Sequence, residues 1–278
     1  MAPYPQSRLR PRFAQDSIAL GAALQCNVMK TSTPKPQNSA SKSIAHPEHP
    51  VTLAIDIGGS GLKAMLLDAA GTPISERQRV ATPEPAVPEA VLEKLHELKQ
   101  LLLGFDRVSV GFPGVIKRGC TLGAFNLHPT WAGFPLQEGL EKRWKKPVRV
   151  ANDAAVQGYG AIKGQGVELV LTLGTGLGSS LFTRGRLCPG LELGHHPWLK
   201  KTYEDYLGRR GLEKFGKKHW NKLLQEAIDE TSRLFNWDHL YLGGGNAKKI
   251  EFTPPEHVTI ISNETGILGG VKLWQDQE

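Results

Sequence analysis

Cysteine is scarce in this chain and long apolar runs are missing. Only three cysteines occur in 278 residues, at Cys26, Cys120 and Cys188, and none belongs to a CxxC pair. Scattered thiols argue against a disulfide framework or a cysteine-built zinc centre, so we expect a protein of the reducing cytoplasm. No apolar run approaches the roughly 18 residues that a membrane-spanning helix needs. We therefore expect no membrane partner.

A concentrated basic surface is also lacking, despite a net charge of +7 at pH 7. Residues 1–50 contain six Lys or Arg and two Asp or Glu, a surplus of +4, which leaves +3 for the remaining chain. A domain of that size with so small a surplus does not form a nucleic-acid-binding face by charge alone. We expect no nucleic-acid partner.

Residues 1–49 differ in composition from the rest of the chain. They are rich in Pro, Ser, Thr and Lys and lack apolar periodicity, so we expect a disordered basic extension. Three spaced arginines and a short apolar patch are typical of a targeting segment. An unstructured tail, or an upstream start codon with Met29 as the true initiator, explains the same residues. The sequence leaves these three alternatives open.

From Val51 onward, apolar strands alternate with segments of helical periodicity, which is typical of an α/β fold. Two stretches share one arrangement. "VTLAIDIGGSGLKAMLL" and "LVLTLGTGLGSSLF" each place two strands around a glycine turn, near residues 58 and 176. Neither turn has the GxGxxG spacing, nor a following helix, that a dinucleotide site requires. The sequence thus predicts two similar halves.

The first turn combines Asp56 with Gly58, Gly59, Ser60, Gly61 and Lys63. Backbone N–H groups of a glycine turn bind anions, but an adjacent carboxylate repels a phosphate unless a divalent cation lies between them. We interpret this as a Mg²⁺–phosphate site in which Asp56 holds the metal through water. A tight hairpin capped by the aspartate is the alternative. A second turn at Gly174, Thr175 and Gly176 favours the phosphate site, because a phosphate chain needs a grip from both sides.

The best candidate for a catalytic base lies between the two turns. "VRVANDAAVQG" places Asn152 and Asp153 where a buried strand meets a helix. An aspartate there is commonly only a helix N-cap, yet a strand end is also where α/β proteins place their chemistry. A carboxylate can accept the proton of a hydroxyl that attacks a phosphoryl group. Downstream, Glu192, His195 and Glu204 are candidates for holding a polyol.

These motifs together resemble the ROK family of sugar kinases, and most closely its polyphosphate glucokinase-like branch. The segments that carry the resemblance are "DIGGSGLK", "GFPG", "NLHPTW", "ANDAAVQG", "TLGTGLGSSLF", "ELGHH", "YEDYLG" and "LYLGGGN", in order from Val51 to Trp274. The resemblance implies a ribonuclease H-like, two-lobed actin/hexokinase-type fold. We expect an N-terminal lobe at residues 50–152 and a C-terminal lobe at 153–278, with the last helix packing back on the N-terminal lobe.

The resemblance also implies an activity: phosphorylation of a hexose, most often glucose at the 6-hydroxyl, by ATP or inorganic polyphosphate with Mg²⁺. Asp153 would be the general base. The sugar would be held by Gly114, Asn126, Asn152, Glu192, His195 and Glu204. Asp56, Gly58, Gly59, Ser60, Gly61 and Lys63 would form the first phosphate loop, Gly174, Thr175 and Gly176 the second, and Gly243, Gly244 and Gly245 the adenosine site. A homodimer is the habit of the family.

Two features set this sequence apart from the family pattern. Many members carry a zinc-binding cysteine cluster after the Glu-x-Gly-His motif, whereas "HPWLKKT" fills that interval here. We therefore expect no zinc and predict that packing alone positions Glu204. Family repressors add an N-terminal DNA-binding domain, which the proline-rich tail does not supply.

The phosphoryl donor and the sugar stay open. Arg210, Lys214 and Lys217 would form one stripe on a continuous helix, which suits a polyanion longer than ATP, although such a run is more often only a solvated face. A non-catalytic sugar sensor on the same fold, and a kinase for mannose, fructose or an N-acetylhexosamine, are the alternative functions.

Overall fold

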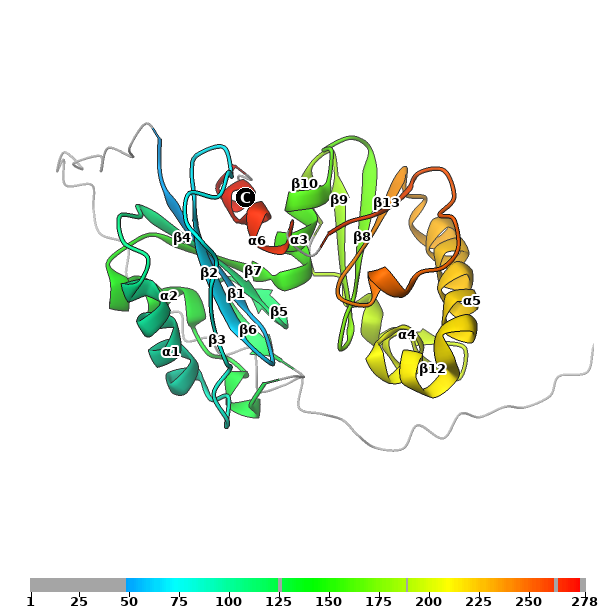
Figure 1. Cartoon of the computed structure of the whole chain (residues 1–278), viewed down its shortest axis with the longest axis horizontal. Helices are drawn as coiled ribbons and strands as arrows, with labels where there is room; N and C mark the ends of the chain where they lie inside the picture. Colours follow the sequence, from blue (N-terminus) through cyan, green and yellow to red (C-terminus); the bar gives the residue numbers. More distant parts are fainter. Residues whose placement is uncertain (1–48, 125–126, 189, 263–264, 276–278) are drawn as a thin grey trace, which may run out of the picture.

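The computed structural model describes residues 49–124, 127–188, 190–262 and 265–275. Almost all of the expected N-terminal extension lies outside these residues. Two lobes stand side by side in Figure 1, each built on one twisted sheet, with helices between the sheets and on the outer faces. Within the described residues, no helix combines the length and apolar character needed to cross a membrane.

The first sheet has five strands in the order β3-β2-β1-β4-β7. They are β1 (Thr52–Ile57), β2 (Leu62–Leu67), β3 (Gln78–Val80), β4 (Arg107–Phe112) and β7 (Val148–Asn152). The first three strands pair antiparallel, whereas β1, β4 and β7 run parallel. Two helices, α1 (Pro88–Gln100) and α2 (Leu136–Trp144), pack on this lobe.

The second sheet repeats this plan in the order β10-β9-β8-β13-β14. Its strands are β8 (Val167–Leu173), β9 (Leu177–Thr183), β10 (Arg186–Leu187), β13 (His239–Gly243) and β14 (Val258–Ile260). Again the first three pair antiparallel and the last two join in parallel. The sequence prediction of an α/β fold with two similar halves, each beginning with a hairpin around a glycine turn, is confirmed.

Short elements complete the chain. In the first lobe these are β5 (Val115–Lys117), β6 (Cys120–Gly123) and the 3₁₀ turn η1 (Pro129–Trp131). In the second they are η2 (Leu193–His195), β11 (Pro197–Trp198), β12 (Lys201–Thr202), α4 (Tyr203–Leu207), α5 (Arg209–Phe235) and η3 (Ala247–Lys249). The last described elements are α6 (Thr265–Leu268) and the 3₁₀ helix η4 (Gly269–Trp274). The predicted terminal helix over "TGILGGVKLW" is therefore α-helical only in its first four residues.

Local sequence explains why these elements form. In α1, Pro88 occupies the first turn, where its missing N–H costs nothing, and Val91, Leu95 and Leu98 recur at helical spacing on the buried face. Strand β1 is buried along nearly its whole length, as expected for a central strand covered on both faces.

The layer between the two sheets is built from α3 (Asp153–Ala161) and the C-terminal segment. Val156 and Tyr159 of α3 lie in one apolar cluster with Phe182 of the second sheet. Val271 of η4 instead packs with Ala54 of the first sheet. The segment that follows the first sheet thus covers the second, and the end of the chain returns to the first.

Close contacts hold the C-terminal segment in this layer. The Ser109 hydroxyl donates to the Gly270 carbonyl at 2.6 Å and accepts a hydrogen bond from the Trp274 indole at 2.9 Å. A Cβ on Gly269 would lie only 1.9 Å from the Val156 carbonyl oxygen, so α3 and η4 approach as closely as backbones can. The division of the lobes at residues 152 and 153 stays a prediction.

A buried carboxylate organises the loop that enters the second sheet. Glu168 is 1% exposed and accepts hydrogen bonds from the backbone N–H groups of Lys163, Gly164 and Gln165 at 2.7–3.0 Å. The Tyr241 hydroxyl donates to the same carboxylate at 2.9 Å. Burial, together with this hydrogen bond and the negative charge, raises the pKa of Tyr241 to about 12. Glu168 is therefore a structural group that replaces water for four donors.

We predict that Glu168→Gln lowers stability by about 2–4 kcal/mol, because an amide NH₂ cannot accept the loop's N–H groups and leaves buried donors unpaired. That corresponds to a fall in Tm of roughly 5–12 °C for a chain of this size. Tyr241→Phe, which removes one donor and leaves the acceptor, should cost about 1 kcal/mol. Thermal unfolding of the full chain measures both, and an unchanged Tm in Glu168→Gln would refute this role.

Candidate functional site

The first glycine turn joins β1 to β2 and leaves backbone donors exposed. The Gly58 N–H donates to the Gly61 carbonyl at 3.0 Å and closes the turn. A Cβ on Gly58 would lie 2.9 Å from that carbonyl oxygen, so the turn requires glycine there. Among the described residues, the exposed N–H groups of Gly59 and Ser60 have no acceptor. Open amides at one bend suit an oxyanion.

Asp56 and Lys63 face each other across the same hairpin. They occupy directly paired positions of β1 and β2, and the Lys63 Nζ lies 2.7 Å from the Asp56 Oδ2. Lysine beside the turn offsets the carboxylate that would otherwise repel a phosphate. Asp56 also carries an oxygen ligand of the kind that Mg²⁺ prefers.

The second glycine turn joins β8 to β9 at the equivalent place in the second sheet. The Gly174 N–H donates to the Gly176 carbonyl at 3.0 Å, and Thr175 at the tip is exposed. Helix α5 begins directly against this turn, because the Arg209 N–H donates to the Gly174 and Thr175 carbonyls at 3.1 and 3.2 Å. The carbonyls of the turn are thereby occupied by protein, whereas its tip is open.

The predicted adenosine loop lies beside the second turn. Gly243 ends β13, and Gly244 and Gly245 follow it; Gly244 has φ 87°, and a Cβ there would lie 2.4 Å from the Leu173 carbonyl oxygen. Asn246 fixes the loop to the turn: its Nδ2 donates to the Gly174 carbonyl at 2.8 Å. Asn246 belongs to the segment "LYLGGGN", but the sequence alone predicted no role for it.

Asp153 is the first residue of α3, and the N-cap position before it belongs to Asn152. The N-cap is Asn152, whose Oδ1 accepts from the Ala154 N–H at 2.9 Å while its Nδ2 donates to the Gly114 carbonyl at 3.1 Å. The Asp153 carboxylate also accepts from the Ala154 N–H, at 2.7 Å. Capping therefore does not depend on Asp153, and Asn152 instead ties the helix start to Gly114.

The surroundings of Asp153 disfavour the charged form of its carboxyl group. Burial of the carboxyl, followed by the negative charge of Asp56 and a smaller effect of Glu192, raises its pKa to about 7, against the pull of backbone N–H groups. Gly111 of β4 lies directly beside Asp153, since a Cβ there would be in van der Waals contact with the Asp153 Cα at 3.5 Å. Asp56 from the first sheet and Glu192 from the second lobe thus both act on one carboxyl group.

Glu192, His195 and Glu204 form a second polar group. Burial raises the pKa of Glu192. The interaction with His195 lowers this pKa, and the negative charge of Glu204 raises it further. The Glu204 Oε2 accepts from the Leu177 N–H at 3.0 Å, beside Gly176 of the second turn. The prediction that packing alone positions Glu204 is therefore wrong, since a backbone hydrogen bond anchors it.

Of the two remaining residues predicted to contact the sugar, Gly114 and Asn126, the structure describes only Gly114. Gly114 lies between β4 and β5, where a Cβ would come within 2.1 Å of the Gly123 carbonyl oxygen. Asn126 lies outside the described residues.

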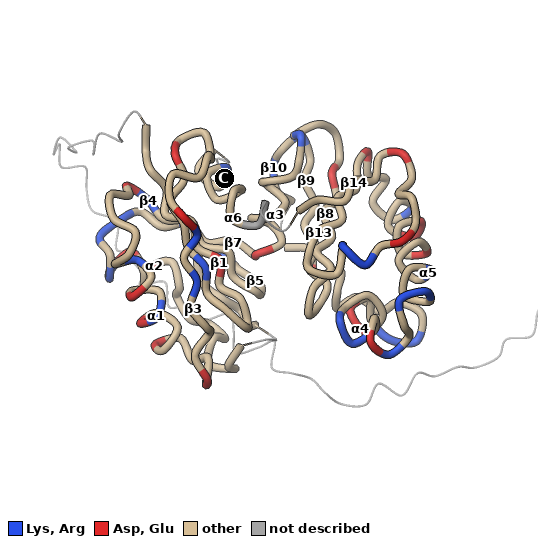
Figure 2. The backbone as a smooth tube through the Cα atoms, in the orientation of Figure 1, with Lys and Arg blue, Asp and Glu red and all other residues tan. Residues whose placement is uncertain are grey.

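The basic stripe predicted on the helix after Glu204 does not exist as one face. Gly216 interrupts α5 with φ 72° and ψ 158°, so Arg210 and Lys214 lie before a kink and Lys217 after it. Basic positions do gather around α4 and the start of α5, as Figure 2 shows. Because of the kink at Gly216, Arg210, Lys214 and Lys217 do not form a single row.

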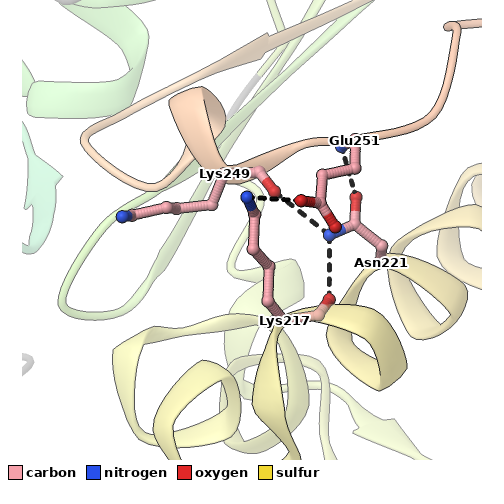
Figure 3. A network of polar contacts seen from close by, with 4 residues as sticks. All are labelled: Lys217, Asn221, Lys249 and Glu251. Carbon is pink, nitrogen blue, oxygen red and sulfur yellow. Dashed lines mark hydrogen bonds and ion pairs between the residues drawn. The ribbon is translucent and has the colours of Figure 1, made fainter.

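Lys217 is also engaged within the protein. Its Nζ lies 2.5 Å from the Glu251 Oε1, and the neighbouring Asn221 donates to the Lys217 and Lys249 carbonyls at 2.9 and 3.1 Å. Figure 3 shows this network joining α5 to the segment after η3, with the Lys249 side chain pointing away from it. Lys217 is thus paired with Glu251 at the surface of the second lobe.

Sequence reasoning missed two residues at the first turn. The Thr82 hydroxyl donates to the Gly58 carbonyl at 2.5 Å. The Arg79 guanidinium lies over Gly61, with its Nε 2.9 Å from the place of a Cβ. Only the pairing of β3 with β2 could have revealed them, and register at a short edge strand is not readable from the sequence.

The chain is similar to known proteins over most of its length. Residues 52–252 match the ROK family. The polyphosphate glucokinase of Mycobacterium leprae is 27% identical over 285 residues, covering 95% of this chain and 87% of that protein. An N-acetylmannosamine kinase of Escherichia coli is 37% identical over 153 residues, 52% of each chain. The solved inorganic polyphosphate/ATP-glucomannokinase of Arthrobacter sp. strain KM superposes with a TM-score of 0.73 at 31% identity, covering 81% of this chain and 98% of that one. The chain therefore belongs to the ROK family, in its branch of sugar kinases that includes the polyphosphate glucokinases.

Proposed function

We propose that this protein transfers a phosphoryl group from inorganic polyphosphate, ATP or both to a hexose, namely glucose at its 6-hydroxyl, with Asp153 as the general base. The observation that carries the proposal is the Asp153 carboxyl, which has a pKa near neutrality between Asp56 of one lobe and Glu192 of the other. A base with such a pKa accepts the hydroxyl proton most effectively at physiological pH.

The remaining residues divide into two roles. Asn152, Glu192, His195, Glu204 and Gly114 hold the sugar hydroxyls near Asp153, and Asn126 is proposed for the same role from the family resemblance alone. The two glycine turns hold the phosphate chain, each supplying backbone N–H groups from the equivalent hairpin of its sheet. Phosphoryl transfer needs little beyond such positioning and charge neutralisation.

The residues at the first turn fit Mg²⁺. Asp56 supplies an oxygen ligand, and its repulsion of Asp153 is a negative potential that a divalent cation would relieve. Asp56 would hold the ion through water together with donor oxygens. When bound, Mg²⁺ supplies neutralisation of the phosphate charge. Lys63 adds a second positive charge at the same turn.

The names of the relatives and the loop that follows β13 support polyphosphate and ATP as the phosphoryl donors. Polyphosphate appears in the names of the mycobacterial and Arthrobacter relatives, and the latter also names ATP. The loop at Gly243, Gly244 and Gly245, fixed to the second turn by Asn246, supports a place for adenosine. A homodimer and a cytoplasmic location are proposed from the family resemblance and the scarcity of cysteine.

One alternative acceptor is favoured by a specific observation. The match to an N-acetylmannosamine kinase reaches 37% identity, although over only half of the chain. An N-acetylhexosamine, mannose or fructose would meet the same carboxylates. A non-catalytic sugar sensor is disfavoured, because it has no use for a desolvated carboxyl between two open glycine turns.

The direct test is a matrix of acceptors and donors on the full chain. Glucose, mannose, fructose and N-acetylmannosamine are each combined with ATP or polyphosphate, with and without Mg²⁺, and the sugar phosphate is measured. We expect product with glucose, dependent on Mg²⁺. Sugar binding without product in any combination would overturn the kinase proposal in favour of a sensor.

We predict that Asp153→Asn lowers kcat about 10²- to 10⁴-fold, the usual contribution of a general base. Sugar affinity, measured by calorimetry, should stay within about threefold, because the other hydroxyl contacts are retained. Asp229→Asn on the exposed face of α5 is the matched control and should behave as wild type. Near-normal turnover in Asp153→Asn would disprove the assignment of the base.

We also predict that kcat/KM for the sugar falls on the acid side of about pH 7, where the Asp153 carboxyl becomes protonated. The sign follows from the raised pKa: protonation removes the base, so activity is lost as pH falls and is regained as it rises. A profile from pH 5 to 9 should show roughly a tenfold loss per pH unit well below the pKa. A flat profile down to pH 5 would contradict a base with this pKa.

A further inference from the structure

Three charged residues form a row across one face of the first sheet. Asp56 of β1 pairs directly with Lys63 of β2, and Lys63 pairs directly with Arg79 of β3. Directly paired residues of neighbouring strands project to the same face. Asp56 and Lys63 flank the first glycine turn, so the row begins at the turn described above.

The Arg79 side chain extends along this face to the first glycine turn. Gly61 lies two residues before Lys63 and therefore points to the same side of β2. A Cβ on Gly61 would meet the Arg79 Nε at 2.9 Å and its Nη2 at 3.2 Å. The guanidinium thus covers Gly61 at the end of the strand, beside the turn formed by Gly58, Gly59 and Ser60.

The charges in the row are unequally compensated. Lys63 is paired with Asp56 at 2.7 Å. Arg79 is exposed, and among the ion pairs formed by the described residues none includes it. A guanidinium presents a planar set of N–H donors that matches two oxygens of a phosphate, and it stays charged at all relevant pH values. An unneutralised guanidinium beside open backbone amides is an arrangement for an oxyanion.

We propose that Arg79 binds phosphoryl oxygens of the donor at the first glycine turn. This inference rests on the proposed function for the identity of the donor, but the anion site itself is defined by the geometry of β1, β2 and β3. The ligand class is a phosphate chain, either inorganic polyphosphate or the triphosphate of a nucleotide. Arg79 holds the chain next to Lys63 and Asp56, and a side chain at position 61 would make the guanidinium shift from this place.

The first experiment measures binding without turnover. Inorganic tripolyphosphate with Mg²⁺ is titrated calorimetrically into the full chain, into Arg79→Ala, into Arg79→Lys and into Arg77→Ala. We expect about 10- to 100-fold weaker binding for Arg79→Ala, the range for loss of a charged hydrogen-bond pair. Arg79→Lys should recover part of the affinity, because it restores the charge without the forked geometry.

Arg77→Ala is the matched control, since Arg77 is also exposed and lies two residues before Arg79, outside β3. It should bind as wild type. Equal losses in Arg77→Ala and Arg79→Ala would mean that only the general positive potential matters and would overturn the assignment. Tm values of the variants, expected to match wild type, exclude a folding defect.

The second experiment separates the donors and the proposed function. In steady-state assays with ATP or polyphosphate, Arg79→Ala should raise KM for the donor about tenfold or more and change KM for the sugar less than twofold. An effect in one donor arm alone identifies which phosphate chain reaches Arg79. A normal donor KM and normal tripolyphosphate affinity would refute the role of Arg79 and leave the kinase proposal standing. Tripolyphosphate binding lost in Arg79→Ala, in a protein without kinase activity, would refute the kinase proposal and support the anion site.

Discussion

The structure depends on keeping one carboxyl group, that of Asp153, in an environment that does not favour its charge. Burial and the neighbouring Asp56 and Glu192 raise its pKa, and the start of α3, capped by Asn152, places it there. Carboxylates placed so close together cost free energy unless something in the site profits from them. Accepting a hydroxyl proton and binding a cation are two such uses, and both are compatible with the phosphoryl transfer proposed above.

The two sheets serve this site through their repeated plan. Each begins with an antiparallel hairpin, and each hairpin places a glycine turn at its tip. The layer between the sheets joins them: α3 packs on both sheets, Val271 packs on the first, and Leu273 lies in the cluster that α3 forms with the second. This layer therefore connects the two lobes, and within it the backbones of Gly269 and Val156 are in direct contact. The two glycine turns belong to separate lobes.

Sequence reasoning succeeded where a local pattern has a single structural solution. The glycine turns, the alternation of strands and helices and the strand-to-helix junction at Asn152 and Asp153 follow from local pattern. It failed where the outcome depends on a backbone choice or a distant partner. A helical stripe at Arg210, Lys214 and Lys217 required α5 to be continuous, but Gly216 adopts a conformation that only its lack of a side chain makes inexpensive. Glu204 is anchored by the Leu177 N–H, 27 residues away, which no local pattern specifies.

The sequence by itself determined the α/β class, the duplication, the two glycine turns and a candidate base, because strand periodicity, glycine and strand-end carboxylates are local properties of the chain. Only the tertiary structure decided that Asn152 caps α3 and contacts Gly114, and that Asp56 and Glu192 act on the same carboxyl. It also placed Arg79 beside Gly61 through the register of β3 on β2. Electrostatic coupling and strand register are set by distances between segments far apart in the chain, and those distances exist only once the chain has folded.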